Sequence, residues 1–450
     1  MKERNSRNLP SRSWLRPFKN ASILAIGRGA QGVLSLLYVV LATRVLGPEQ
    51  FGLLTMIHGV VLVAAQIVRF QSWQAVMRFG AQALAANDHF RLWRVLNFAL
   101  LLDIVSALAA AGALWVAMAE FAEFFQLPDV LVETARWYGL SVGCIVLGAT
   151  PLGVLRLFDC HAIIAWQTTV EPLVRLVTTA LCFALNAELE YFLIGWFAAS
   201  LLSKGALFAG GLYVLFSNGI NPEGRLFGPD WWKPEDGIWR FSFGTYLSST
   251  LNISDVQIGP LLVGSFWGPA AAGLYRVAQQ VGNVVSKPVS KLLAPAIYTD
   301  FSELSVVRDR RARLELILRA GGLAGILALG LFAVLALSGR AIISLLFGDA
   351  YLEAYSVMLW LAWSGVIAAA IFPLAPLLIT SGRVYAVVLV RSLALGCYLA
   401  MFYSLAPTYG LTSGGMAVVA HGVAMAVFLA VAVAVFAHRT SLDESGDPLY

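Results

Sequence analysis

Charged side chains are scarce in this sequence of 450 residues: Asp, Glu, Lys and Arg make up only 13%, whereas 59% of the residues are hydrophobic. Soluble globular domains carry roughly 25% charged and about 45–50% apolar residues. A chain with so few charges could not cover a water-facing surface of the size that 450 residues require. The composition therefore excludes a soluble protein and indicates one that is embedded in a membrane.

Catalytic and metal-binding signatures are also missing. The sequence has no G-x-x-x-x-G-K-[ST] loop for nucleotide phosphates and no His-Glu-x-x-His pattern for a metal ion. Its four cysteines lie in or at the ends of apolar runs without the spacing of metal ligands, and we interpret them as small core residues: Cys144, Cys160, Cys182 and Cys397. The sequence thus predicts a protein that is not an enzyme and that uses no metal and no cofactor.

Long apolar runs fill the chain instead. A run of about twenty apolar residues can cross the ~30 Å hydrocarbon core of a bilayer as a helix. Such runs predict an all-α membrane protein with about twelve transmembrane helices, at residues 21–45, 51–70, 95–118, 137–157, 163–184, 191–216, 238–263, 270–297, 314–337, 355–379, 385–405 and 411–437. The predicted parts are a basic N-terminal segment, a first six-helix lobe, a linker, a second six-helix lobe and a tail, at residues 1–20, 21–216, 217–237, 238–437 and 438–450, respectively.

Basic and acidic residues alternate between the connectors of this map. Lys and Arg gather in the N-terminal segment and in every second connector, for example at Arg91 and Arg94. The other connectors carry acids such as Glu120 and Asp129. Because Lys and Arg stay on the cytoplasmic side during insertion, the pattern predicts that both termini are cytoplasmic. It also explains the net charge of +5 without nucleic acid as a partner.

The two halves of the chain share a motif. Gly-Pro-x-x-x-Gly-Leu follows the first predicted helix and recurs 221 residues later, after the seventh, at Gly47, Pro48 and Gly52 and at Gly268, Pro269 and Gly273. Each half holds an even number of helices, so both copies run across the membrane in the same direction. This predicts a parallel repeat, with two lobes related by an axis along the membrane normal around a central cavity.

Eight charged residues fall inside the apolar runs: Arg28, Asp103, Glu171, Arg175, Lys204, Asp255, Arg276 and Arg391. One such side chain at the bilayer centre costs about 2.5–3.5 kcal/mol, so we expect them to face the protein interior or a wet cavity. Glu171 and Arg175 are one helical turn apart and can pair along one face. Asp255 and Arg276 lie at similar depth in successive helices and can pair across them.

Pairing these charges leaves a surplus of positive charge, because more of them are basic than acidic. Arg28 and Arg391 both lie roughly 10 Å from the cytoplasmic end of a helix, in opposite halves. A guanidinium group binds phosphate oxygens through two hydrogen bonds and keeps its charge. The candidate substrate-binding residues are therefore Arg28, Arg175, Arg276 and Arg391. The candidates for ion coupling or for structural ion pairs, two roles that the sequence leaves open, are Asp103, Glu171, Asp255 and Lys204.

Two segments resemble a known family. Residues 44–52 (Arg-Val-Leu-Gly-Pro-Glu-Gln-Phe-Gly) are similar to the region after the first helix of bacterial polysaccharide biosynthesis transporters of the O-antigen flippase type. The start of their second half resembles the stretch with Asn252, Asp255, Gly264, Gly268, Gly273, Tyr275 and Pro288. The similarity in pattern extends over residues 20–437.

The resemblance implies a V-shaped pair of six-helix lobes of the multidrug/oligosaccharidyl-lipid/polysaccharide (MOP) exporter superfamily. It implies a flippase of the bacterial inner membrane that moves an undecaprenyl-diphosphate-linked oligosaccharide to the outer leaflet, for O-antigen of lipopolysaccharide, capsule or exopolysaccharide. Membrane lipids and other polysaccharide-assembly membrane proteins would be its further partners. The chain lacks the two additional helices of the peptidoglycan-precursor branch, and that branch's cavity arginines have no position-by-position match here. The candidate arginines thus depend on the physical argument alone.

Three alternative functions deserve comparison. An ion-coupled exporter of the multidrug and toxin extrusion type would share the fold and could use Asp103, Glu171 or Asp255, although surplus arginine disfavours a cationic drug as cargo. An O-antigen polymerase, which is an enzyme, would carry a large outer loop with catalytic arginines, whereas the outer connectors here are short. A major-facilitator permease would place Gly, Asp and paired basic residues after the second helix, and residues 71–91 lack this pattern.

Overall fold

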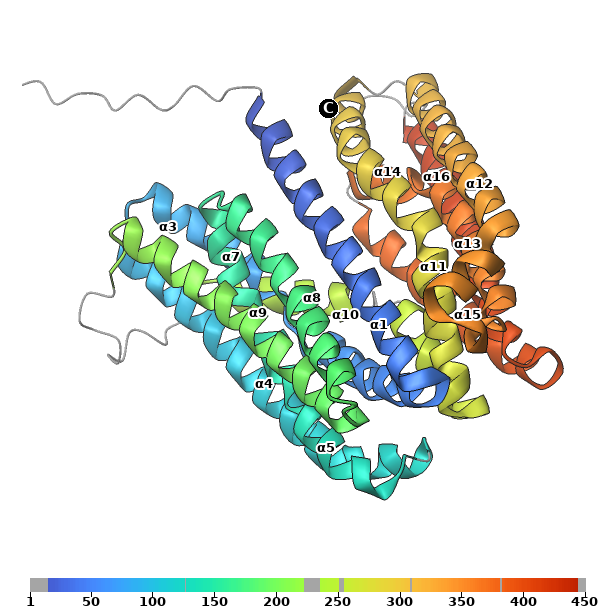
Figure 1. Cartoon of the computed structure of the whole chain (residues 1–450). Coiled ribbons are helices and arrows are strands. Elements are labelled where there is room, and N and C mark those ends of the chain that lie inside the picture. Colours follow the sequence, from blue (N-terminus) through green and yellow to red (C-terminus); the bar gives the residue numbers. More distant parts are fainter. Residues whose placement is uncertain are drawn as a thin grey trace, which may run out of the picture.

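The computed structural model describes residues 15–125, 127–221, 235–250, 255–307, 310–380 and 383–443 (Figure 1). Side chains are described for these residues except 15–25, 248, 255–256, 286–307, 310–314, 380, 384 and 436–443. Helices make up nearly all of the described chain, which contains no strand. Eight helical segments of this part are long and apolar enough to cross a membrane. The all-α fold predicted from composition is confirmed.

The first lobe consists of α1 (Leu15–Val68), α2 (Ser72–Ala75), the π-helix η1 (Val76–Gly80), α3 (Ala81–Ala85), α4 (His89–Phe124), α5 (Asp129–Gly139), α6 (Ser141–Leu147), α7 (Ala149–Leu157), α8 (His161–Ala184) and α9 (Leu189–Ser217). A kink divides α1 into two spans, and α5, α6 and α7 together form one broken span. These spans match the predicted helices of the first half to within a few residues, except that α4 and the α5–α7 span begin earlier.

The second lobe consists of α10 (Ile238–Thr250), α11 (Asp255–Val307), α12 (Arg310–Phe347), the 3-10 helix η3 (Asp349–Tyr351), α13 (Ala354–Ile371), α14 (Leu374–Thr380), α15 (Val384–Tyr409) and α16 (Thr412–Asp443). The helices α12, α15 and α16 begin 221, 223 and 223 residues after α4, α8 and α9, respectively. The repeat predicted from one short motif therefore extends through the helices of both lobes.

Both Gly-Pro motifs bend a long helix in the same way. Gly47 divides α1 at φ 69° and ψ 177°, and Gly268 divides α11 at φ 82° and ψ 179°. Glycine adopts a positive φ without the steric cost that a Cβ would add. The proline that follows each glycine has no N–H to continue the preceding helix. Each motif thus ends one span and begins the next.

The two motifs meet at one end of the molecule, which we call the closed end. A Cβ added to Gly52 would overlap the carbonyl group of Pro269, and a Cβ added to Gly273 would overlap the carbonyl oxygen of Pro48. The backbones of α1 and α11 therefore touch, and these two helices form the most extensive contact between the lobes. The last glycine of each motif is required by the approach of the other lobe.

Side chains join the lobes further at the closed end. The guanidinium group of Arg44, on α1, donates from Nε to the carbonyl oxygen of Leu346 at 2.8 Å and from Nη2 to that of Leu345, in the last turn of α12. Tyr351 donates its hydroxyl to the carbonyl oxygen of Thr43 at 3.3 Å. A cation at a helix C-terminus is electrostatically favourable.

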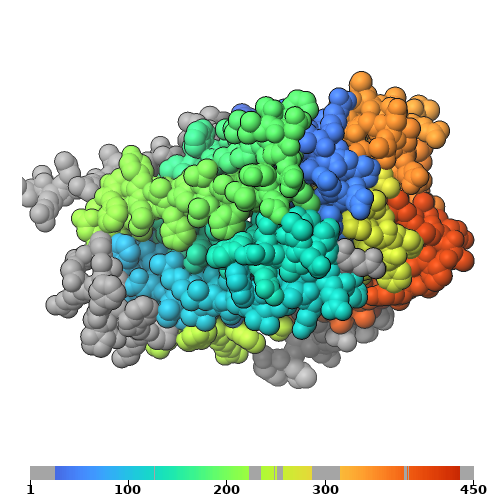
Figure 2. Space-filling model, turned by 60° about the horizontal axis from the view of Figure 1, so that its bottom comes forward, coloured from blue at the N-terminus to red at the C-terminus, as the bar shows by residue number. Residues whose placement is uncertain are grey.

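Away from the closed end the lobes diverge. In Figure 1 the blue-to-green first lobe and the yellow-to-red second lobe separate toward the top, where α1 begins and α14 lies. Figure 2, turned to bring the lower face forward, shows the lobes in contact with part of α1 between them. The V-shaped pair of lobes predicted from the family resemblance is confirmed.

One helix that was predicted as part of the second lobe packs on the first. Phe70 stacks on Tyr246 of α10 with 4.4 Å between ring centroids, and Phe98 packs edge-on against Trp239 of α10 at 4.9 Å. The predicted span 238–263 comprises α10 and the start of α11, and residues 251–254 between them lie outside the described part. The predicted boundary of the second lobe at residue 238 stays a prediction.

Candidate functional site

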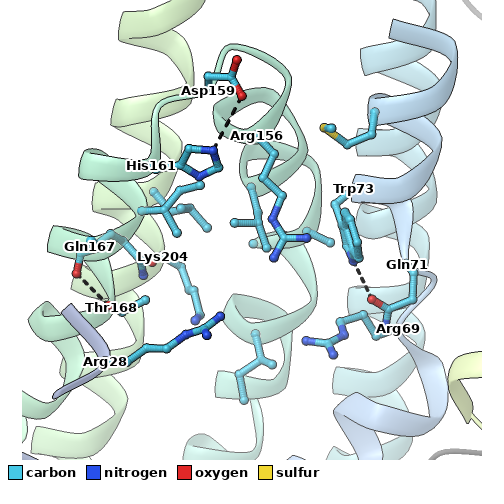
Figure 3. A pocket seen from close by; sticks show the side chains of 18 residues that line it. Arg28, Arg69, Gln71, Trp73, Arg156, Asp159, His161, Gln167, Thr168 and Lys204 are labelled. Atoms are coloured by element: carbon cyan, nitrogen blue, oxygen red, sulfur yellow. Dashed lines mark hydrogen bonds and ion pairs between the residues drawn. The ribbon is translucent and has the colours of Figure 1, made fainter. Parts of the chain in front are cut away.

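A cavity of about 750 Å³ lies inside the first lobe, away from the closed end (Figure 3). Its walls come from the N-terminal part of α1, the break between α1 and α2, α2, η1, α6, α7, α8 and α9. Pockets of roughly 300–1,000 Å³ are typical of sites that enclose small-molecule ligands.

Four cationic side chains line this cavity and point toward a common space: Arg28, Arg69, Arg156 and Lys204 (Figure 3). The single carboxylate among the lining residues is Asp159, whose side chain is 85% exposed and lies 3.6 Å from His161. The cavity is therefore strongly electropositive. This charge suits an anionic ligand with several oxygen acceptors, such as a phosphate or diphosphate group.

Arg28 reaches the cavity because α1 approaches α8 closely. A Cβ on the neighbouring Gly27 would lie 2.9 Å from Cβ of Ala165, which itself lines the cavity. The side chain of Arg28 is exposed, so its guanidinium group is available to a ligand. The sequence analysis placed Arg28 at a cavity between the lobes, whereas this cavity lies inside the first lobe, so a role of Arg28 in substrate binding stays a prediction.

Arg156 and Trp73 contact each other in the cavity wall. The guanidinium carbon of Arg156 lies 4.1 Å from the Trp73 ring centroid, and Nε1 of Trp73 donates to Oε1 of Gln71 at 2.7 Å. Gly153 permits this approach of α7 to α2, since a Cβ there would lie 2.9 Å from Cα of Trp73. The stacking fixes the plane of Arg156 and leaves its donors directed to the cavity.

Lys204 connects the cavity to a buried polar cluster. Its Nζ lies 3.8 Å from Glu171, and Glu171 accepts a hydrogen bond from Nη2 of Arg175 at 2.6 Å. Arg175 lies over the Trp196 ring at 4.3 Å and donates to the hydroxyl of Tyr38 at 3.4 Å. The predicted Glu171–Arg175 pair is confirmed. Arg175 is buried in this cluster and is not among the residues that line the cavity.

The sequence left open whether Asp103 takes part in ion coupling or in an ion pair. In the structure its carboxyl group accepts hydrogen bonds. It is fully buried on α4, where Oδ1 accepts from Ser72 Oγ at 2.6 Å. Its Oδ2 accepts from the backbone N–H of Thr150 at 3.0 Å and from Thr150 Oγ1 at 2.7 Å.

The structure does not bring the second-lobe candidates into this cavity. Arg276 donates to Oε1 of Gln279 at 2.8 Å, and the side chain of Asp255 lies outside the described residues, so their pairing stays a prediction. Arg391 is half-buried on α15 and is not among the lining residues. This cavity lies inside the first lobe, so a capture site between the lobes formed by Arg28 and Arg391 stays a prediction.

Two lining cations escaped the sequence analysis. Arg69 and Arg156 lie at the ends of the predicted helices 51–70 and 137–157, next to the cytoplasmic side, so both looked like ordinary inner-side charges. Their position next to Gln71-Ser72 and Pro151, where helices break, was the available signal. The described residues contain no group of three or more His, Cys, Asp and Glu able to hold a metal ion.

The family model described as "Polysaccharide biosynthesis protein" matches residues 18–305, more than half of the chain. The chain belongs to this family. A further relative is the inner membrane protein YghQ of Escherichia coli (strain K12), 26% identical over 357 residues, which are 76% of this chain and 95% of that protein.

Solved structures share the fold of this family member. An inward-facing multidrug resistance MATE family transporter of the MOP superfamily has a TM-score of 0.73 at 15% identity, over 93% of this chain and 96% of its own. The lipid II flippase MurJ in an inward closed conformation has a TM-score of 0.70 at 13% identity, over 92% and 87%. An outward-facing MATE transporter has a TM-score of 0.64 at 16% identity, over 94% and 96%. These likenesses show that the chain has the two-lobed helical fold of these transporters.

Proposed function

We propose that this protein moves a polyprenyl-diphosphate-linked oligosaccharide from the inner to the outer leaflet of the bacterial cytoplasmic membrane. The observation that carries the proposal is the convergence of Arg28, Arg69, Arg156 and Lys204 on one cavity of about 750 Å³. An undecaprenyl diphosphate supplies the matching anion, and the family's place in polysaccharide biosynthesis supplies the glycan.

The physical reason is the cost of desolvation. A diphosphate cannot cross hydrocarbon unaided, because an unpaired ion loses many kcal/mol of hydration there. Fixed guanidinium and ammonium groups replace that hydration, while the polyprenyl tail remains in the lipid beside the protein. No covalent chemistry is needed, only two conformations that expose the same cavity to alternate sides.

The proposal includes an orientation. With the termini in the cytoplasm, the cavity lies toward the cytoplasmic side and the closed end faces the periplasm, so this conformation is inward-facing. Reporter fusions after Ala85 and after Ser305 should then read cytoplasmic, whereas fusions after Phe124 and after Ala187 should read periplasmic. A periplasmic signal at Ser305 would contradict the parallel repeat, because the second half would be inverted.

Export of a cationic drug is the rival function, and the MATE structures give it the same fold. A cation site would need acids in the cavity, whereas Asp159 is the single lining carboxylate and lies mostly in solvent. The charge of the cavity therefore favours an anionic cargo.

Binding and transport by purified protein test the choice. Geranyl diphosphate should bind wild-type protein and geraniol should not, and proteoliposomes should flip a fluorescent polyprenyl-diphosphate oligosaccharide. Arg28→Gln with Lys204→Gln should weaken geranyl diphosphate binding by about tenfold or more, since two charge-assisted contacts are lost. Arg319→Gln is the matched control, because Arg319 is exposed on α12 and pairs with Glu315. Uptake of cationic dyes with no response to diphosphates would reject the flippase function.

A further inference from the structure

A buried carboxylate on α4, outside the cavity, connects two elements of the cavity wall, α2 and α7. Asp103, on α4, accepts hydrogen bonds from Ser72 at the start of α2 and from Thr150 at the start of α7. Its side chain is not exposed at all. One backbone N–H and two hydroxyl groups thus surround both oxygens of the carboxyl group.

Both hydrogen-bonded residues lie where a span is broken. Ser72 follows the break after α1, three residues beyond Arg69. Thr150 is the second residue of α7, which carries Arg156 one and a half turns later. N–H groups in the first turn of a helix have no partner within the helix, and a carboxylate there is favourable for both hydrogen bonding and the helix dipole. Asp103 therefore fixes the two breaks that deliver Arg69 and Arg156 to one cavity.

Asp103 also lies beside the segment that carries Arg69. Ser72, which donates to Asp103, follows Arg69 by three residues, and Arg69 lines the cavity. The Nε of Arg69 is buried and has no hydrogen-bond partner within the described part of the chain. Arg69 is thus held at the wall by packing, close in the chain to the residue that binds Asp103.

We propose that Asp103 is a positioning residue that sets both the place and the net charge of the diphosphate site. Its hydrogen bonds hold Arg69 and Arg156 at the cavity wall. Its negative charge offsets part of the attraction of Arg69, so that the headgroup is captured and can also be released. The inference deepens the proposed function and rests on it.

Two substitutions separate position from charge. Asp103→Asn keeps the shape and can still hydrogen-bond Ser72 and Thr150, because the serine hydroxyl can accept from the amide. It removes only the negative charge, so geranyl diphosphate should bind roughly fivefold more tightly. Flipping at saturating substrate should slow, because release becomes slower. Asp103→Ala loses the hydrogen bonds as well, so it should bind more weakly than wild type.

The Arg69 background tests whether the effect passes through that residue. In Arg69→Gln protein, Asp103→Asn should no longer tighten binding, because a coupling energy disappears when either partner is removed. Ser72→Ala and Thr150→Val keep the charge of Asp103 but each removes a hydrogen bond to it, so they should weaken geranyl diphosphate binding. They replace Asp103→Ala in the test if that variant does not fold. Wild-type affinity in Asp103→Asn, or equal tightening with and without Arg69, overturns the inference. Failure of the wild type to prefer geranyl diphosphate over geraniol would instead overturn the proposed function.

Discussion

The cavity of the first lobe is lined by four cations, whereas the hollow of about 460 Å³ between α12 and α13 of the second lobe is lined by apolar side chains and glycines, among them Trp363 and Leu374. Part of the two linings is related by the repeat, because α6 and α7 of the first lobe correspond to α13 and α14 of the second. At the 221-residue offset of α4 and α12, Asp103 and Arg156 of the first lobe correspond to Ala324 and Leu377 of the second. At the 223-residue offset of α15 and α16, Arg175 and Lys204 correspond to Tyr398 and Val427.

This difference distinguishes the helix kinks, which both lobes of a transporter must share, from the binding site, which one lobe alone can supply. The kinks at Gly47 and Gly268 must match, because the glycine that follows each one packs against the other lobe's backbone. A binding site has no such requirement, since charges in one lobe suffice to hold a headgroup. The proposed role of the second lobe is to move against a loaded first lobe.

Substitutions at the glycines where the two lobes touch should have the largest effect on transport. Gly52→Val and Gly273→Val should each abolish transport and lower thermal stability, because the new side chain overlaps a proline carbonyl of the other lobe. Overpacking a tight contact costs about 1–3 kcal/mol or more. Flipping in proteoliposomes and the melting temperature in detergent measure the two effects.

Gly330→Val is the matched control, because a side chain there meets open space. Both closed-end variants should suffer alike, since the contact is reciprocal. Normal transport by either one would mean that the lobes do not need this backbone contact.

Changing charges should affect the lobes unequally. Lys204→Gln and Arg156→Gln should each raise the KM for the lipid-linked substrate by about fivefold to tenfold, because each removes a charge-assisted contact to the diphosphate. Arg156→Lys should recover only part of the loss, because lysine lacks the planar fork. Arg391→Gln should change KM less than about twofold if the first lobe alone binds the headgroup. A larger effect of Arg391→Gln would instead support the capture site predicted from sequence.

The sequence predicted those structural features that depend only on residues close together in the chain. The Gly-Pro motif predicted both kinks, because a positive φ and a missing N–H are local properties, and the spacing of Glu171 and Arg175 predicted their pair. Helix depth alone predicted that Arg28 and Arg391 share a site, and that stays a prediction, because depth does not specify which side of the helix a residue faces. Arg69 and Arg156 were missed because their positions depend on breaks that Asp103 holds from another helix.

A smaller effect is expected at the asymmetric part of the closed end. Arg44 binds the last carbonyls of α12, whereas its counterpart at the repeat distance, Ser265, donates to Leu262 in its own helix at 2.8 Å. Arg44→Gln should therefore loosen the closed end without distorting either lobe. Charged groups at a helix C-terminus contribute about 0.3–1 kcal/mol, so the open population should rise roughly twofold to fivefold.

Distances between spin labels can measure this population. Labels at Phe124 and Tyr409, both exposed at the closed-end tips of α4 and α15, should report more long distances in the Arg44→Gln protein. The four native cysteines would be replaced first. A Ser265→Ala control should leave the distribution unchanged. An equal shift in both variants would show that the asymmetry has no mechanical consequence.

The smallest effect is expected where α10 crosses from the second repeat to the first lobe. The corresponding start of α1 packs along α8, whereas α10 packs on α1 and α2, and the adjacent Glu235 pairs with Arg91 at 3.0 Å and with Arg94. Both arginines keep contact with solvent, so these pairs contribute at most about 1 kcal/mol, and Glu235→Gln should change transport less than about twofold.

Trp239→Ala and Tyr246→Ala should lower transport more than Glu235→Gln does, because they remove aromatic contacts with Phe98 and Phe70. If Glu235→Gln instead matched the aromatic variants, the ion pairs rather than the rings would hold α10 on the first lobe. Exchange of the charges in Glu235→Arg with Arg91→Glu would then recover activity.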